Sequence, residues 1–206
     1  MQELFITFMR HGRSRADDEN VHEGRYDSPL TAVGEQQVQT RARGWLKCGV
    51  TFDHIVCSPL LRARRTAEII AAALQLPLKN DPDWMEMDNG SLAGLSHEVA
   101  LQRFPVPDFR NPYEAMAESG ESEWQLYNRA TQALERVIRQ GIASTLVVSH
   151  GAVLNAAFRG IVGAQPPVNN AGVFFALGDT GYLRCRYRPA KHQWLILELN
   201  PGFKCP

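Results

Sequence analysis

Phe8-Met9-Arg10-His11-Gly12-Arg13-Ser14 is the stretch around which the sequence is organised. The apolar run before it, residues 4–9, predicts a strand that is buried on both faces of a sheet. Arg10-His11-Gly12 follows at once, so a guanidinium and an imidazole lie at the carboxyl end of a central strand, where open α/β sheets bind ligands. These groups favour phosphoryl transfer to a histidine nitrogen, with the arginine holding phosphate oxygens. Gly12 would let the backbone turn sharply and approach the ligand.

Two further predicted strands end in groups of the same kind. Residues 55–57 end a short strand, and we expect Ser58 to cap the following helix, which puts Arg62 in its first turn, where an anion is favoured. Residues 145–148 form a second buried strand, followed directly by Ser149-His150-Gly151. Three strand ends therefore deliver arginine and histidine side chains to one edge of the sheet.

The rest of the chain alternates between predicted helices and strands. A long polar loop covers residues 13–29, and we interpret it as functional because it leaves directly from the proposed site. Residues 77–83 are expected to be a connector, and residues 95–120 a helical or irregular insertion. Thr31 and Ser122 are expected helix N-caps, the latter in a capping box. The last expected elements are strands at 173–177, 182–187 and 194–199, with a turn at Asp179-Thr180-Gly181.

The composition is that of an ordinary globular protein. The 206 residues are 44% apolar and 21% charged, which suits one sizeable core. We therefore expect a single domain over residues 1–206, with a small insertion at about 95–120 near the active site. The formal net charge is zero, which does not indicate a nucleic acid or an anionic membrane as partner. No apolar run approaches the roughly 20 residues that span a bilayer, and the N-terminus lacks a signal-peptide pattern.

The cysteines indicate neither disulfides nor metals. Cys48, Cys57, Cys185 and Cys205 lack the close pairing of a disulfide framework or a metal site, so we expect a reduced, cytoplasmic protein without metal or cofactor. A cysteine-dependent phosphatase would need an arginine where Ala63 stands, so Cys57 is interpreted as a buried core residue. The histidines outside the strand-end motifs are interpreted as ordinary surface or core residues: His22, His54, His97 and His192.

Taken together and in order, the motifs resemble the histidine phosphatase superfamily, with its phosphoglycerate-mutase-like fold. The resemblance extends over nearly the whole chain. It implies an α/β fold, a three-layer α/β/α sandwich with a mostly parallel central sheet and helices on both faces. The matching pieces are Arg10-His11-Gly12 with Ser14, Asp27 to Thr31, Ser58-Pro59-Leu60-Leu61-Arg62-Ala63 with Thr66-Ala67, Glu86 with Gly90 and Gly94, Gly120-Glu121-Ser122, and Ser149-His150-Gly151.

The resemblance also implies catalytic roles. His11 would be the nucleophile that becomes phosphorylated, which requires one ring nitrogen to be unprotonated and the other to be held by a backbone carbonyl. Arg10, Arg62 and His150 would surround the phosphoryl oxygens and stabilise the charge of the transition state. Glu86 would protonate the leaving oxygen and later accept a proton from the attacking water.

The loop after the nucleophile is implied to contact the substrate. Its implied substrate-binding residues are Ser14, Asp17, Glu23 and Gly24. Asp17 stands where the mutases carry Asn, and Glu23 where they carry Thr, so two added carboxylates would repel the carboxylate of a phosphoglycerate. The alternative is that both point to water or pair with Arg13 and Arg25. Together with the short insertion at about 95–120, these departures favour a phosphatase over a mutase.

The sequence therefore predicts a phosphomonoester hydrolase that acts through phosphohistidine on a small phosphorylated metabolite. A phosphoglycerate mutase-type phosphotransferase is the first alternative, followed by a non-catalytic module that binds a phosphorylated ligand on the same fold. Asp88 and Glu98 are the alternatives to Glu86 for the acid. The expected partner is the small substrate, without nucleic acid or membrane, and a homodimer is compatible with the sequence.

Overall fold

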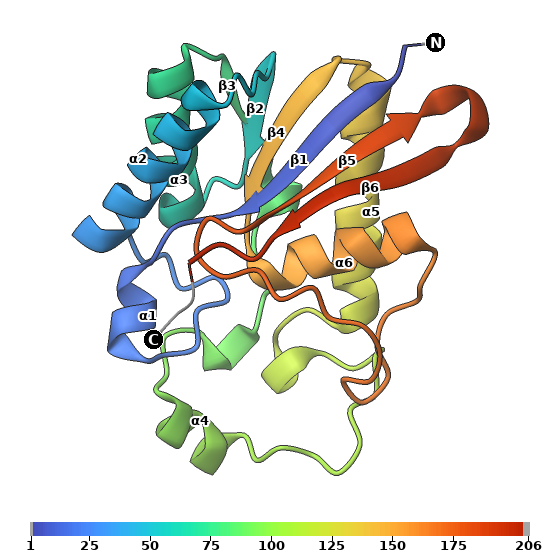
Figure 1. Ribbon diagram of the computed structural model, residues 1–206. Coiled ribbons are helices and arrows are strands. Elements are labelled where there is room, and N and C mark those ends of the chain that lie inside the picture. The colour runs from blue at the N-terminus through green and yellow to red at the C-terminus, as the bar shows by residue number, and fades with distance from the viewer. Residues whose placement is uncertain (1, 204–206) are drawn as a thin grey trace.

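The computed structural model describes residues 2–203, which form a central six-stranded sheet with helices on both faces (Figure 1). The strand order is β3-β2-β4-β1-β5-β6. β3, β2, β4 and β1 are parallel, while β5 and β6 form an antiparallel edge beside β1. The strands are β1 (Leu4–Arg10), β2 (His54–Cys57), β3 (Leu78–Asn80), β4 (Ser144–Ser149), β5 (Tyr182–Arg188) and β6 (Gln193–Asn200). The predicted three-layer α/β fold is confirmed.

Two pairs of helices cover the sheet. In Figure 1, α2 and α3 pack on one face, and α5 and α6 on the other. The α-helices that the structure describes are α1 (Arg15–Glu19), α2 (Ala32–Lys47), α3 (Leu61–Leu74), α4 (His97–Arg103), α5 (Glu123–Gln140) and α6 (Gly151–Val162). Short 3-10 helices lie at η1 (Pro82–Trp84), η2 (Gly90–Leu92), η3 (Met116–Glu118) and η4 (Pro189–Lys191).

The central strands are apolar because both of their faces are covered. Phe8 of β1 and Val147 of β4 pack into the layer of α5 and α6, whereas Met9 and Val148 pack into the layer of α2 and α3. Phe8 is fully buried and makes an edge-to-face contact with Phe158 of α6, with ring centroids 5.6 Å apart. The continuous apolar runs in the sequence therefore reflect burial on both sides.

The helix starts follow the expected capping chemistry with one exception. Thr31 accepts a hydrogen bond from the Gly34 N–H at 3.0 Å, and Ser122 caps α5 in the predicted capping box. The expectation for Ser58 is wrong, because α3 begins at Leu61 with Leu60 as its N-cap. The Ser58 hydroxyl accepts a bond from the Leu60 N–H and also lies 2.8 Å from His150 Nε2.

Three local expectations need correction. Residues 173–177 are not a strand, because the buried Asn155 amide binds both the N–H and the C=O of Phe175, which ties this segment to α6 instead of to the sheet. Residues 13–29 contain α1, whose capping box pairs Ser14 with Asp17, and residues 77–83 contain β3. Cys205 lies outside the described residues.

The buried Phe8 side chain should make a large contribution to the free energy of unfolding of the protein. We expect Phe8→Ala to lower the free energy of unfolding by about 3–5 kcal/mol, because it removes a buried ring and leaves a cavity among packed neighbours. Phe109 is 57% exposed, so Phe109→Ala should change stability by less than about 0.5 kcal/mol. Urea unfolding of both variants measures this, and a Phe8→Ala cost below about 1 kcal/mol would contradict the proposed packing.

Candidate active site

The carboxyl ends of β1, β2 and β4 meet at one edge of the sheet because these strands are parallel and in close register. Arg10 pairs with Ser149 across β1 and β4, and Cys57 pairs with Val148 across β2 and β4. The residues that follow continue this arrangement: the His11 N–H donates to Ser149 O at 3.0 Å, and the Ser58 N–H donates to Val148 O at 3.0 Å. The structure therefore brings together, fully buried, side chains that are far apart in the sequence: His11, Ser58, Arg62 and His150.

The His11 ring is oriented by its own backbone. Its Nδ1 lies 2.7 Å from Gly12 O, which can only accept, so Nδ1 carries a proton in this contact. Its Nε2 faces the Arg62 Nε–H at 3.3 Å, as an acceptor. This is the orientation that a nucleophilic histidine needs. Gly12 serves packing as well: a Cβ there would lie 2.8 Å from Gly34 O, so its close approach is to α2.

Arg62 is buried at the start of α3, and besides its contact with His11 its guanidinium binds the loop that follows His11. It donates to Tyr26 O at 3.0 Å and to Gly24 O at 2.8 Å. Its Nε also lies 3.2 Å from the Glu23 carboxylate. Gly24 has a φ of +47°, and a Cβ there would collide with the Asn89 side chain. The role of Gly24 is therefore to bring its carbonyl to Arg62.

His150 is held by Ser58. Its Nε2 lies 2.8 Å from Ser58 Oγ, which already accepts the Leu60 N–H and can donate its own proton to the ring. In that arrangement the neutral ring carries its proton on Nδ1, which is buried and has no partner among the described residues. Burial lowers the pKa of His150 well below its ordinary value, and the nearby Arg62 acts in the same direction. A buried donor is thus left available.

Arg10 lies at the rim of this cluster. It donates to Leu177 O at 3.1 Å, and its guanidinium lies 3.5 Å from Asp17. The other Asp17 oxygen accepts bonds from the N–H of Ser14 at 2.7 Å and from its hydroxyl at 2.9 Å. Asp17 therefore faces the cluster and does not pair with Arg13, which binds Asp18.

The Glu23 carboxylate occupies the centre of the cluster. One oxygen lies 3.6 Å from His11 Nε2, and the other contacts Arg62 and the Ser14 hydroxyl. Burial alone would raise its pKa, but His11, Arg62 and Ser14 hold the pKa of this carboxyl well below its usual range. The alternative pairing with Arg25 is not found, because Arg25 binds Asp88 at 3.1 Å. A stable negative charge thus stands next to the His11 ring.

The Glu86 side chain lies beside the N-terminus of α6, the helix that begins directly after His150. Its carboxylate accepts the N–H groups of Ala152 and Val153, both at 3.1 Å, so it caps the positive end of the helix. Of the alternative acids, Asp88 is committed to Arg25, and Glu98 is exposed on α4. Among these three carboxylates, only Glu86 contacts the helix that follows the His150 strand end.

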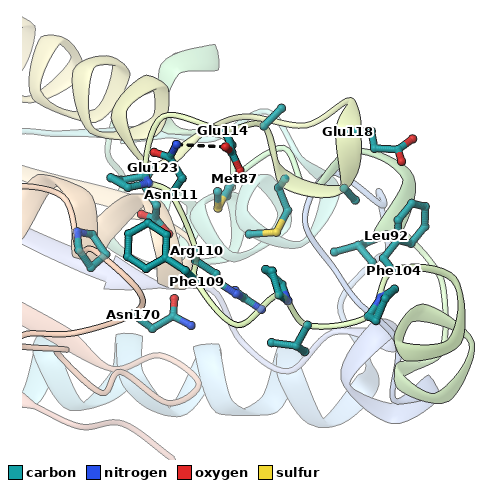
Figure 2. A pocket seen from close by; sticks show the side chains of 18 of the residues that line it. Met87, Leu92, Phe104, Phe109, Arg110, Asn111, Glu114, Glu118, Glu123 and Asn170 are labelled. Carbon is teal, nitrogen blue, oxygen red and sulfur yellow. Dashed lines mark hydrogen bonds between the residues drawn. The ribbon is translucent and has the colours of Figure 1, made fainter.

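A pocket of about 320 Å³ adjoins the Glu86 segment, because Met87 lines it (Figure 2). Its wall comes mostly from the insertion and is largely apolar, with Phe104 and Phe109 among its rings. Figure 2 also places Arg110 and Glu123 at this wall. Burial raises the pKa of Glu123, although nearby arginines act in the opposite direction. The pocket can therefore take an organic group.

Other sequence interpretations have mixed outcomes. Burial raises the pKa of the Cys57 thiol to about 12, which suits a core residue and not a nucleophile. His22 and His97 were interpreted as ordinary, yet they contact each other, with Nε2 and Nδ1 3.1 Å apart. No spacing rule could have found this pair, because it joins the nucleophile loop to the insertion.

Residues 2–203 offer neither a cluster of metal-binding side chains nor a membrane-spanning helix. They contain no group of three or more His, Cys, Asp or Glu side chains arranged to hold a metal ion. No helix in this part of the chain has the length and apolar content to cross a membrane.

Comparisons with known proteins identify a matching family and several relatives. The sequence model of the histidine phosphatase superfamily (branch 1) matches residues 6–198. The uncharacterized phosphatase PhoE of Bacillus subtilis is 34% identical over 198 residues, which cover 95% of this chain and 93% of PhoE. GpmB of Escherichia coli, described as a probable phosphoglycerate mutase, is 35% identical over 167 residues, which cover 78% of this chain and 75% of GpmB.

Solved structures share the fold at lower sequence identity. The alpha-ribazole phosphatase from Shigella flexneri matches with a TM-score of 0.79 and 22% identity, covering 98% of this chain and 100% of that one. A mycobacterial glucosyl-3-phosphoglycerate phosphatase matches with a TM-score of 0.81 and 17% identity, with the same coverage of 98% and 100%. The architecture is therefore common to enzymes of different substrates.

The buried His150 should make stability sensitive to mild acid. Its folded pKa lies below the unfolded value of about 6.5, so the unfolded chain binds more protons as the pH falls below that value. The contribution of neutral His150 to the free energy of unfolding is therefore complete above about pH 6.5. It is lost at lower pH, by up to about 1.4 kcal/mol per pH unit. Urea unfolding from pH 7 to pH 5 should show wild-type stability falling towards that of His150→Gln. Glu23 does not enter this window, because its contribution is lost only below the ordinary carboxyl range. A difference between the two proteins that is independent of pH would contradict this.

Proposed function

Because the chain belongs to the histidine phosphatase superfamily, we propose that it is a phosphomonoester hydrolase that acts through a phosphohistidine on a small phosphorylated metabolite. The observation that carries this proposal is the placement of His11 between Gly12 and Arg62. Its Nδ1 is bound to Gly12 O, and its Nε2 faces the buried guanidinium of Arg62. A neutral imidazole held in this way offers its Nε2 lone pair to a phosphorus atom bound beside Arg62.

In the first step, His11 Nε2 forms a bond to phosphorus while the ester P–O bond breaks. The developing charge on the phosphoryl oxygens is stabilised by Arg10 and Arg62, and by the unpartnered Nδ1–H of His150. The leaving oxygen takes a proton from Glu86, whose carboxyl must be protonated at this stage. The groups that stabilise the phosphoryl oxygens and donate the proton are all side chains of this protein, so the proposed mechanism includes no metal ion.

In the second step, water attacks phosphorus and the P–Nε2 bond breaks. Glu86, now a carboxylate, takes a proton from the water, and orthophosphate leaves with His11 restored. The hydrogen bonds from Ala152 and Val153 support this carboxylate form. We propose that the leaving group binds in the pocket lined by Met87. This pocket adjoins the segment that carries Glu86, and apolar side chains form part of its wall.

The similarity to GpmB keeps a phosphoglycerate mutase activity as the second candidate. The carboxylates at Asp17 and Glu23 favour the hydrolase, because both lie against the arginines that would bind an acidic substrate. Phosphate entering the site has to displace Glu23 from Arg62. We further propose a reducing compartment such as the cytoplasm, since Cys48, Cys57 and Cys185 are free.

A covalent intermediate on His11 is the central test. Rapid quench with substrate labelled in the phosphoryl group should trap one label that is stable in base and labile in acid, as a phosphoramidate is. His11→Ala should lose both the label and turnover, because no other described group takes its place. A chelator should leave turnover unchanged. Label on a cysteine or serine, or normal turnover in His11→Ala, would overturn the proposed function.

The carboxylates of the nucleophile loop should select the substrate. We expect the double variant Asp17→Asn, Glu23→Thr to raise kcat/KM for phosphoglycerates relative to neutral phosphomonoesters by about 10-fold, because it removes like charges next to an acidic substrate. The ratio of the two values in wild type and variant measures the effect, and isomerised product is assayed in parallel. An unchanged ratio would show that these carboxylates do not discriminate.

A further inference from the structure

We propose that Arg129 and Glu121 form a brace that positions Glu86 for proton transfer. This inference rests on the proposed function, since it concerns the acid of that reaction. Neither residue contacts the reacting groups of the proposed mechanism; both act on the backbone that carries Glu86.

The Arg129 guanidinium uses all of its N–H donors on one segment and one carboxylate. From α5 it donates to Asp83 O and Met85 O, both at 2.8 Å, and to Glu86 O at 3.3 Å. It also donates to the two oxygens of Glu121, at 2.7 Å and 2.6 Å. These contacts match the five donors of a guanidinium, so the fork is saturated. One side chain thus fixes three carbonyls around Glu86.

Glu121 extends the brace to the far side of the acid. Its Oε2 accepts the Asp88 N–H at 3.1 Å, and its own N–H donates to Asp88 O at 2.7 Å. Arg25, on the nucleophile loop, binds the Asp88 carboxylate at 3.1 Å. Residues 83–88 are therefore held on both sides of Glu86, and the brace is linked to the loop that carries Glu23.

The brace is largely buried, which makes its parts interdependent. The side chains of Arg129 and Glu121 are only 13% and 11% exposed. Removing Arg129 frees three carbonyls and leaves Glu121 with only the weaker contact to Arg25 at 4.0 Å, and removing Glu121 takes the counter-ion from the poorly hydrated Arg129 guanidinium. The Glu86 carboxylate keeps its bonds to the N–H groups of α6 and of Met87, but the backbone that carries it loses its support from Arg129. A displacement of about 1 Å in such a group can cost about 10²-fold in rate.

Arg136 provides a matched control on the same helix. It binds the carboxylates of Asp81 and Asp83 at 3.1 Å and 2.6 Å, so it too ties α5 to the residues after β3. None of its described bonds reaches residues 85–88. Arg136→Met therefore removes an ion pair between the same helix and the same connection, at a side chain that is 42% exposed, without touching the backbone of Glu86.

The experiment measures kcat/KM for a series of phosphomonoesters whose leaving groups differ in basicity, from nitrophenyl to alkyl phosphates. Glu86→Gln sets the reference, with large losses for basic leaving groups and small ones for nitrophenolate, which departs without protonation. Arg129→Met and Glu121→Gln should reproduce this slope, with losses of about 10- to 100-fold for alkyl phosphates and a few-fold for nitrophenyl phosphate. Arg129→Lys, which keeps the charge but not the fork, should stay close to Arg129→Met. Arg136→Met should keep the wild-type slope.

Each outcome separates the brace from the proposed function. If label is trapped on His11 in wild type and in Glu121→Gln, and the folded brace variants keep the wild-type slope, the brace is wrong and the hydrolase stands. An equal change of slope in Arg136→Met would also overturn the brace. A flat profile in Glu86→Gln would overturn the brace together with the role of Glu86 as the acid, whereas label trapped on His11 would leave the phosphohistidine hydrolase standing. If Arg129→Met does not fold, the same series of leaving groups is measured with Arg129→Lys and Glu121→Gln.

Discussion

The parallel register of β1 with β4, and of β4 with β2, is the constraint on which the site depends. Because paired residues such as Arg10 and Ser149 lie side by side, the residues just beyond the strands must also meet. The N–H of His11 continues the ladder onto Ser149 O, and the N–H of Ser58 continues it onto Val148 O. The sheet thus places both histidines and the start of α3 at a single edge, with no long side chain or flexible loop needed to reach across.

Burying cationic groups at this edge has its own requirements. A guanidinium removed from water needs acceptors, and Arg62 finds them in Tyr26 O, Gly24 O and the carboxylate of Glu23. The polar loop after β1 is therefore the structural partner of a buried charge. Phosphate is well suited to replace Glu23, since it offers oxygens to the same donors. On the opposite side, the Glu86 carboxylate binds N–H groups of α6, and Arg129 of α5 binds the backbone carbonyls around it.

Much of the framework followed from the sequence. Residues 4–9 and 145–148 read as buried strands because their apolar runs are unbroken, and the capping box at Ser122 marked the start of α5 correctly. The errors lie where short-range signals compete. Residues 173–177 have the apolar character of a strand, but the Asn155 amide satisfies the Phe175 backbone first. The first turn of α1 carries a capping box that a loop assignment overlooked.

By itself the sequence determined which chemistry is present and where each piece stands along the chain. His11 and His150 could be assigned to strand ends because each follows an apolar run and precedes a glycine, and such patterns are visible in the local sequence. Only the tertiary structure decided which charges meet. Whether Glu23 pairs with Arg25 or with Arg62, and whether Arg129 reaches the carbonyls beside Glu86, depends on contacts between segments far apart in the sequence. Such contacts are set by the packing of whole layers, and a charged side chain carries no local signal of the partner that the fold will bring to it.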